Sequence, residues 1–356
     1  MTPLEREIRE IIATEGPITV SDYIRFCLAH PKYGYYVTRD PLGTHGDFIT
    51  APEVSQMFGE LIGAWAANVW QQMGSPPKAH LVELGPGRGT LMADLLRVAK
   101  TLPAFRAALS VHLVEISPAL RGAQQRTLGD EMGVQWHEGI QGIPGGPAIF
   151  IANEFIDALP VHQFVKDFDG WHLRAVGIVA GKLDFVVVPH PMQKQFNEDM
   201  PDAPDGTILE LRDEGPTTLV AERLVRNGGA ALIIDYGHNR VTLRNTLQAV
   251  RNHRYADPLA DPGEADLTTQ VSFGELAVWA KREGAAVHGP ITQGDFLRRL
   301  GIEQRAARLK QNATPLQAAD VDSALTRLTA PDQMGELFKV LAIADPKLGP
   351  LPGFDT

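Results

Sequence analysis

A glycine-rich stretch limits the possible folds more than any other feature of this chain. Residues 79–91 read AHLVELGPGRGTL, an apolar run that carries Glu83 and then breaks into Gly85, Gly87 and Gly89. A helix-patterned segment follows at once. Strand, glycine turn and helix form the opening unit of a doubly wound α/β domain, whose ligand lies beyond the carboxyl end of the first strand. Glycines there let the backbone adopt left-handed angles and approach a ligand closely, which a Cβ would prevent.

The spacing of the glycines distinguishes among nucleotide ligands. A dinucleotide-binding fingerprint is G-x-G-x-x-G, whereas this chain has E-x-G-x-G-x-G, one residue tighter and without the lysine of a phosphate-binding loop. The carboxylate of Glu83 suits a ligand with a cationic end better than a phosphate. The motif therefore favours S-adenosyl-L-methionine over NAD or ATP, and Pro86 and Thr90 of the same turn are expected to contact this cofactor.

A second apolar strand, VHLVEI over 111–116, ends in an acidic residue. Glu115 lies 26 positions after Gly89 (115 − 89), about one helix and one strand of a βαβ unit, where an acidic residue binds ribose hydroxyls. A glycine turn alone also suits a purely structural connection. With Glu115 in place, and Ile116 beside it, the pattern favours a nucleoside-binding α/β core.

Composition limits the partners. The 356 residues suit one enlarged domain or two smaller ones. A net charge of −10 without a dense Lys/Arg run argues against nucleic acid. Cys27 is the only cysteine, which excludes an intramolecular disulfide, and the histidines lack HExxH spacing, so we expect no metal. The chain has neither the apolar core of a signal peptide nor a run of ~20 apolar residues. We therefore expect a cytoplasmic protein with no membrane insertion. The composition also allows an oligomer.

The pattern along the chain divides it into two parts. Residues 1–75 are expected to form N-terminal helices and a loop, and 76–356 the core with insertions. We expect one buried helix over 53–73, a β-rich meander over about 161–210 and a substrate-side region over about 240–330. Within that last region, DPLADPGEADLT is expected on the surface because it is rich in Pro, Gly and Asp.

A polar, glycine-containing loop over 38–52 precedes the buried helix. Loops of this length are more often functional than filler. Phe48 and Ile49 are bulky and apolar, and with Thr50 they are candidates for a lid over the cofactor. The alternative is an ordinary surface loop.

Asn153 and Glu154 follow the apolar strand 148–152 and therefore face the same crevice as the glycine turn. Methyltransferases hold the substrate at this strand end, and a carboxylate there pairs with a guanidinium through two parallel hydrogen bonds. Asp157 offers a second carboxylate. Alternatively, Asn153 is a helix or turn cap and Asp157 is solvated.

Two further candidates follow. His162 has the pKa range of a general base near pH 7, or it is a structural histidine with a satisfied hydrogen bond. The Asp-Tyr-Gly run at 235–237 ends another apolar strand and either borders the substrate or forms a turn.

The chain resembles the MidA-like family of S-adenosylmethionine-dependent methyltransferases. The family includes a mitochondrial complex I assembly factor that methylates an arginine of a core NADH dehydrogenase subunit. The matching segments run nearly the full length in order: 35–63, VELGPGRGTLMADLLR at 82–97, HLVEISPALR at 112–121, ANEFIDALPVHQFV at 152–165, IDYGH at 234–238, DPLADPGEADLT at 257–268, GPITQGDFLRRLGI at 289–302 and MGELFKVLA at 334–342.

The resemblance implies a class I methyltransferase fold: α/β, Rossmann-like, with a mostly parallel sheet, an N-terminal helical and loop elaboration and a β-rich insertion. It implies S-adenosyl-L-methionine as cofactor, bound by Gly85, Gly87, Gly89 and Glu115, and Glu154 as the carboxylate that holds a substrate arginine. It further implies a protein substrate, such as a respiratory NADH dehydrogenase subunit methylated during complex I assembly.

Other functions remain open at this point. One alternative keeps the cofactor and methylates a small molecule or another residue type; a second is a non-catalytic assembly chaperone with a retained cofactor fold. The glycine spacing disfavours an NAD oxidoreductase. The chain also departs from the family, which often has A-H-V-D-F after DLT, whereas here 269–273 read TQVSF. Gln270 and Ser272 replace that histidine and aspartate near the expected substrate side.

Overall fold

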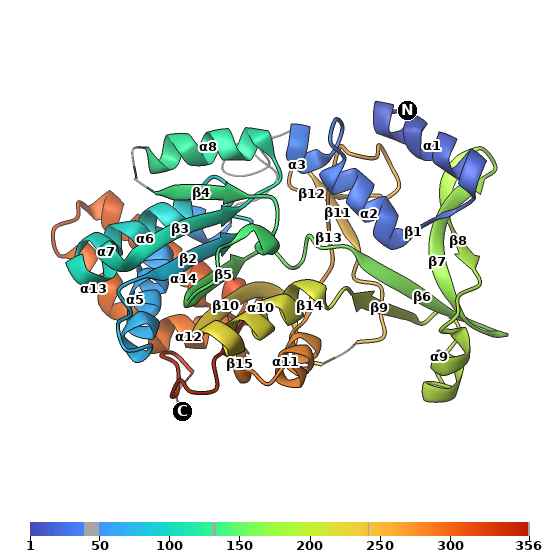
Figure 1. Cartoon of the computed structure of the whole chain (residues 1–356). Coiled ribbons are helices and arrows are strands. Elements are labelled where there is room, and N and C mark those ends of the chain that lie inside the picture. The colour runs from blue at the N-terminus through green and yellow to red at the C-terminus, as the bar shows by residue number, and fades with distance from the viewer. Residues whose placement is uncertain (39–49, 130, 132, 241, 355–356) are drawn as a thin grey trace.

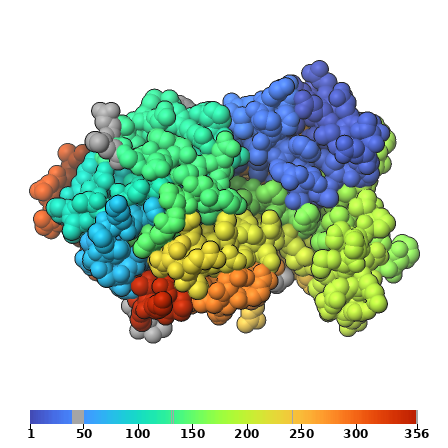
Figure 2. Space-filling model, in the orientation of Figure 1, coloured from blue at the N-terminus to red at the C-terminus, as the bar shows by residue number. Residues whose placement is uncertain are grey.

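The computed structural model describes residues 1–38, 50–129, 131, 133–240 and 242–354 (Figure 1). Phe48 and Ile49 lie outside the described residues. A large part of the molecule surrounds a central sheet, and a smaller part combines the N-terminal helices with antiparallel strands. Figure 2 shows the N-terminal residues, in blue, against the yellow-green insertion.

The central sheet has the strand order β15-β16-β10-β5-β2-β3-β4. All neighbours from β10 to β4 pair in parallel, and β16 runs antiparallel to both β10 and β15. The strands are β2 (Ala79–Leu84), β3 (Leu109–Val114), β4 (Val134–His137), β5 (Ala148–Asn153), β10 (Gly229–His238), β15 (Ala286–Thr292) and β16 (Phe338–Ala344), with β14 (Val271–Ser272) beside the end of β10. Such a mostly parallel sheet was predicted.

Both faces of this sheet are covered, which explains why its strands are apolar runs rather than alternating patterns. Consecutive residues of one strand enter different cores: Leu232 packs on one face and Ile233 on the other. The first core receives α5 (Gln56–Gln72), α6 (Thr90–Lys100), α7 (Pro103–Ala108), α12 (Gln293–Arg299), α13 (Ile302–Lys310) and α14 (Pro315–Thr329). The second receives α10 (Gly215–Asn227), α11 (Phe273–Arg282) and η1 (Ile140–Gly142).

The predicted continuous helix over 53–73 was wrong at its start. α4 (Ala51–Val54) ends at Ser55, whose backbone is extended with φ −164° and ψ 140°. The Ser55 hydroxyl accepts a hydrogen bond from Met57 N at 3.2 Å and so caps α5. The break leaves Glu53 on α4, where it accepts a hydrogen bond from Thr90 Oγ1 at 2.6 Å.

A second sheet of antiparallel strands forms the insertion. Its order is β1-β7-β6-β9, with β8 also paired to β7. Its elements and the helices around them are α1 (Pro3–Glu15), β1 (Ile18–Thr19), α2 (Val20–Ala29), α3 (Tyr35–Thr38), β6 (Val161–Asp167), β7 (Gly170–Val179), β8 (Lys182–Val188), α9 (Gln193–Asp199) and β9 (Ile208–Arg212). The N-terminal helices α1 and α2 share a core with β6 and β7, whereas α5 belongs to the central sheet.

The expected surface stretch DPLADPGEADLT is partly buried. β13 (Asp266–Thr268) pairs with β11 (Gln248–Arg251), which also pairs with β12 (Arg254–Ala256). Ala265 and Leu267 join the core beneath α2. The Pro/Gly/Asp composition correctly predicted exposure for much of the first half of the stretch. The second half is buried because its apolar residues pack into that core.

The remaining helices are α8 (Pro118–Leu128), which lies beside β4 in Figure 1, and α15 (Met334–Leu337). Among the described helices, none is long and apolar enough to cross a membrane. Within the same residues we find no cluster of three or more His, Cys, Asp or Glu side chains that would hold a metal ion.

Candidate functional site

A cavity of about 390 Å³ opens at the carboxyl ends of β2, β3 and β5. Its lining includes ten of the predicted site residues: Thr50, Glu83, Gly85, Pro86, Gly87, Thr90, Glu115, Ile116, Asn153 and Glu154. Of the predicted residues that the structure describes, the remaining three, Gly89, Asp157 and His162, lie outside this lining. The cavity is therefore at the strand end that the glycine motif indicated.

The glycine turn passes close to the loop that follows β5. Gly85 has φ +62° and donates its N–H to Val114 O at 3.1 Å. A Cβ on Gly85 would lie 2.7 Å from Phe155 Cδ2, which is closer than side-chain carbons approach one another. Gly89, with φ +83°, is the N-cap of α6. Glycine is thus required by backbone angle at both positions and by close approach at the first.

Glu83 presents a buried carboxylate to the cavity. Its side chain comes from β2, and Oε2 accepts no hydrogen bond from the part of the chain that the structure describes. Burial raises the pKa of Glu83 to about 8. A cationic ligand group beside this carboxyl would favour its ionised form and supply the missing partner.

Glu115 follows β3 and is fixed on two sides. Its carboxylate accepts hydrogen bonds from Ser117 N at 2.7 Å and from Gln124 Nε2 at 3.2 Å. Gln124 Nε2 also donates to Gly87 O at 2.8 Å, and Trp136 Nε1 donates to Gln124 Oε1 at 2.8 Å. Burial raises the pKa of Glu115, and the hydrogen bonds from Ser117 and Gln124 oppose that rise. Gln124 thereby joins the glycine turn to the acidic strand end, a role that the sequence pattern did not reveal.

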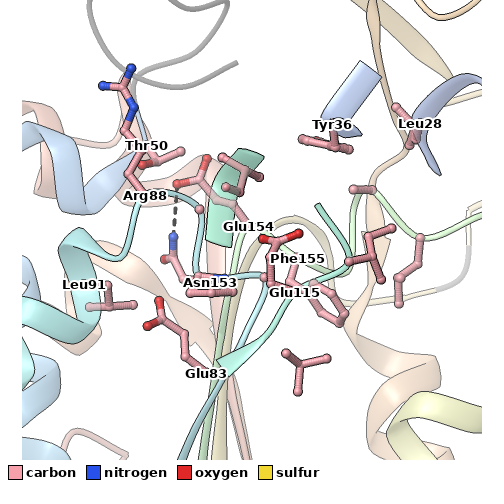
Figure 3. A pocket seen from close by; sticks show the side chains of 18 of the residues that line it. Leu28, Tyr36, Thr50, Glu83, Arg88, Leu91, Glu115, Asn153, Glu154 and Phe155 are labelled. Atoms are coloured by element: carbon pink, nitrogen blue, oxygen red, sulfur yellow. Dashed lines mark hydrogen bonds between the residues drawn. The ribbon is translucent and has the colours of Figure 1, made fainter. Parts of the chain in front are cut away.

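Glu154 lies in the left-handed region, with φ +50°, directly after β5. Its Oε1 accepts hydrogen bonds from Ala51 N at 3.0 Å and from Asn153 Nδ2 at 3.3 Å, the latter drawn as a dashed line in Figure 3. Asn153 therefore does not cap a helix; its amide group supports the neighbouring carboxylate. Burial raises the pKa of Glu154 to about 7, and the charge of Asp157 adds to the rise.

The two other candidate catalytic residues lie elsewhere. Asp157 is buried rather than solvated, and burial raises its pKa to about 6 although Arg212 lowers it. His162 is exposed on β6. Asp235 was predicted to border the substrate or to form a turn; instead it lies inside β10, and its Oδ2 accepts hydrogen bonds from the backbone of the loop after β5.

The opposite wall of the cavity comes from the N-terminal helices, which sequence patterns did not assign to the site. Arg25, Leu28 and Tyr36 line it, and Figure 3 shows Leu28 and Tyr36 across from Glu83. The Tyr36 hydroxyl donates to both carboxylate oxygens of Asp266, at 3.0 and 3.1 Å. Residues 30–37, HPKYGYYV, are rich in tyrosine, but nothing in their spacing specifies which ring faces the cavity.

The two departures from the family pattern lie in a different place. Gln270 and Ser272 line a small cavity of about 20 Å³ together with Glu210, Arg212 and His238, not the large one. Gln270 Oε1 accepts a hydrogen bond from Arg244 at 2.8 Å. The two positions where the family often has histidine and aspartate thus lie outside the lining of the large cavity.

The described residues fit S-adenosyl-L-methionine. The volume is within the usual range of ligand pockets, roughly 300–1,000 Å³. The glycine turn leaves room that a Cβ would fill, and Glu83 Oε2 and Asn153 Oδ1 are buried oxygens without a hydrogen-bond donor among the described residues. Carboxylates at the ends of β2 and β3 suit an amino group and a ribose, respectively.

Comparisons with known proteins point to the same chemistry. A model of a family of S-adenosyl-L-methionine-dependent methyltransferases matches residues 61–291. A crystal structure of a protein from Burkholderia thailandensis, described as a methyl transferase and bound to S-adenosyl-homocysteine, has a TM-score of 0.87 and 29% identity; the match covers 98% of this chain and 93% of that chain.

Curated relatives are similar over most of their length. The protein arginine methyltransferase NDUFAF7 of Danio rerio, named as mitochondrial, is 38% identical over 94% of this chain and 85% of its own. The human protein of the same name is 37% identical over 96% of this chain and 83% of its own.

These similarities confirm the predicted fold class and the family resemblance, and S-adenosyl-L-methionine as the cofactor. They overturn the prediction of a cytoplasmic location, because the relatives are named as mitochondrial proteins. That prediction used the absence of a recognisable targeting pattern, which says little about where a chain functions.

Proposed function

We propose, from the premise that this chain belongs to the family of S-adenosyl-L-methionine-dependent methyltransferases, that it methylates an arginine side chain of a protein. Bound S-adenosyl-L-methionine supplies an electrophilic methyl group on its sulfonium. The observation that carries the arginine assignment is the carboxylate of Glu154 at the end of β5. Both of its hydrogen bonds from described residues end on Oε1, which leaves Oε2 to accept a hydrogen bond from the guanidinium that receives the methyl group.

Cofactor binding would use the residues of the first two strand ends. The backbone of Gly85 and Gly87 approaches the ligand, the carboxylate of Glu83 pairs with a cationic group, and Glu115 accepts from hydroxyls. Gly89 acts indirectly, as the N-cap that starts α6. All of these residues except Gly89 line the cavity.

The acceptor chemistry follows from the charge of arginine. A guanidinium stays protonated at neutral pH, so an acceptor nitrogen must be oriented and must lose a proton during transfer. Glu154 can do both, because Oε2 can accept a charge-assisted hydrogen bond from a guanidinium and the pKa of about 7 suits proton acceptance near neutral pH. We assign no step to His162, which is exposed on β6.

The far wall of the cavity suits an arginine stem. Leu28 and the ring of Tyr36 provide apolar surface on this wall, and Leu159 of the loop after β5 adds to it. Apolar surface packs against the methylene groups of arginine, and an aromatic face attracts a guanidinium. We therefore propose that the acceptor side chain enters between α2–α3 and the loop after β5.

The protein substrate is proposed by analogy with the relatives, which are named protein arginine methyltransferases. We propose an NADH dehydrogenase subunit, in agreement with the family resemblance. The test uses NADH dehydrogenase purified from a strain that lacks this gene, incubated with the protein and S-adenosyl-L-methionine and analysed by mass spectrometry of its peptides.

The expected result is methylarginine in one subunit, formed by the parent protein and not by a Glu154→Gln variant that still binds S-adenosyl-homocysteine. Methylation of lysine or of a small molecule would refute the arginine assignment. Cofactor binding without any transfer, together with failed assembly in the deletion strain, would favour the chaperone.

A further inference from the structure

Three residues outside the cavity lining fix the backbone of the loop that carries Glu154. The loop runs from Asn153, at the end of β5, to Pro160, before β6, and Glu154, Phe155, Ala158, Leu159 and Pro160 within it line the cavity. Residues 154–160 of this loop form neither a helix nor a strand. Its backbone polar groups therefore need partners from elsewhere in the fold.

Asp235 provides partners for two of these groups. From β10, its Oδ2 accepts hydrogen bonds from Ile156 N at 2.9 Å and Asp157 N at 3.2 Å. Asp235 is fully buried. Burial and the charge of Asp157 raise the pKa of Asp235, and a single oxygen of this carboxyl accepts both backbone N–H groups.

Arg212 binds the same loop from the other direction. From β9, its Nη1 donates to Ile156 O at 2.7 Å and Leu159 O at 2.9 Å. Its Nη2 donates to Thr269 Oγ1 at 2.7 Å. The two carbonyl groups therefore share one guanidinium nitrogen, and the rigid guanidinium plane directs the other nitrogen to Thr269.

Thr269 completes the arrangement directly after β13. It is almost fully buried, its N–H donates to Asp157 O at 3.0 Å, and its hydroxyl orients Arg212. Five backbone groups between residues 156 and 159 are thus bound from three separate elements.

Glu154 depends on this arrangement because its own backbone is strained. A non-glycine residue with φ +50° keeps that angle only where the surrounding structure imposes it. Upstream, Glu154 N donates to Ile234 O at 2.9 Å, adjacent in sequence to Asp235. The backbone is therefore held on both sides of the strained residue.

We infer that Arg212, Asp235 and Thr269 are positioning residues, which hold the loop so that Glu154 meets the acceptor nitrogen, and which take no part in binding the cofactor. This inference builds on the proposed arginine methylation. It assigns Asp157 a structural place within the held loop.

The test compares Asp235→Asn and Thr269→Val with Thr269→Ser, which keeps the hydroxyl. Asp345→Asn is the matched control, because Asp345 is a buried aspartate that accepts a backbone N–H, from Lys347 at 3.0 Å. It follows β16 at the level where β10 begins, away from the loop after β5. Four readouts are needed: amide hydrogen exchange of the 153–160 loop, kcat, KM for the arginine substrate, and Kd for S-adenosyl-homocysteine.

We expect faster exchange at Ile156 and Asp157 in the first two variants, and a kcat lower by about 10²-fold, since small misplacements of reacting groups cost about that much. The Kd should stay within about twofold, and Thr269→Ser and Asp345→Asn should behave as the parent. If Asp235→Asn does not fold, the comparison of Thr269→Val with Thr269→Ser tests the inference.

Two results would overturn the inference: unchanged loop exchange and kcat in Asp235→Asn and Thr269→Val, or a fall in cofactor affinity that accounts for the lost rate. If the parent methylates no arginine and yet loop exchange rises in both variants, the proposed function fails while the loop-holding role stands.

Discussion

Replacing Gly85 by alanine tests whether the glycine turn is shaped for the cofactor or only for the fold. The new Cβ would lie 2.7 Å from Phe155 Cδ2, and ordinary contact begins near 3.4 Å, so the ring or the turn must move by at least 0.7 Å (3.4 − 2.7). Left-handed angles add about 1–2 kcal/mol for a residue with a Cβ. Both Gly85 and Phe155 line the cavity, so the displacement is transmitted to the cofactor site.

Gly74→Ala is the matched control. Gly74 has φ +83°, and nothing lies within 4 Å of the Cβ that alanine would add. It therefore carries the backbone cost without the clash. We expect Gly74→Ala to lose about 1–2 kcal/mol of unfolding free energy, and Gly85→Ala to lose more because its Cβ also clashes. Only Gly85→Ala should lose affinity for S-adenosyl-homocysteine, by at least about tenfold.

Urea denaturation and calorimetric titration measure the two quantities. Equal cofactor affinity in Gly85→Ala and the parent would refute the view that the tight packing of Gly85 against Phe155 shapes the binding site. Lost affinity in Gly74→Ala would show that backbone strain alone explains the effect.

Three further predictions concern single residues. His112 is central in a row of three hydrogen-bonded imidazoles, and burial lowers its pKa to about 4. Because the imidazole of the unfolded chain binds a proton below about pH 6.5, the unfolding free energy should fall on acidification by roughly 1.4 kcal/mol per pH unit until about pH 4. Urea titrations of His112→Gln should show a smaller slope. Tyr36→Phe removes the hydrogen bond to Asp266 and should lower the unfolding free energy by about 1.5–3 kcal/mol, measured against the parent; no change would contradict the role of that bond. Glu115→Gln should weaken S-adenosyl-homocysteine binding by about 10- to 100-fold in calorimetry, and unchanged affinity would remove Glu115 from the cofactor site.

The sequence predicted the central sheet and its ligand edge because both follow from local patterns. Apolar runs broken by glycine specify strand, turn and helix within a few residues, and the parallel arrangement brings all carboxyl ends to one edge. Glu83, Glu115 and Glu154 could therefore be placed at one cavity before the fold was known, and all three line it.

What the sequence did not predict depends on contacts between distant segments. Tyr36 reaches the cavity because α2 and α3 pack on the insertion, and Asp235 binds a loop 78 to 79 positions away. Ser55 breaks a helix that its apolar pattern would continue, because its hydroxyl caps the next helix. No periodicity in a single segment reports such contacts.

The central claim is that Glu154 holds and deprotonates a substrate arginine, and Glu154→Gln tests it most directly. This nearly isosteric change removes the charge and the proton acceptor and keeps an oxygen for the hydrogen bond from Ala51 N. Methylarginine formation on NADH dehydrogenase from the deletion strain should fall by about 10²- to 10⁴-fold, while S-adenosyl-homocysteine binds as tightly as to the parent. Transfer at the parental rate by Glu154→Gln would contradict the claim.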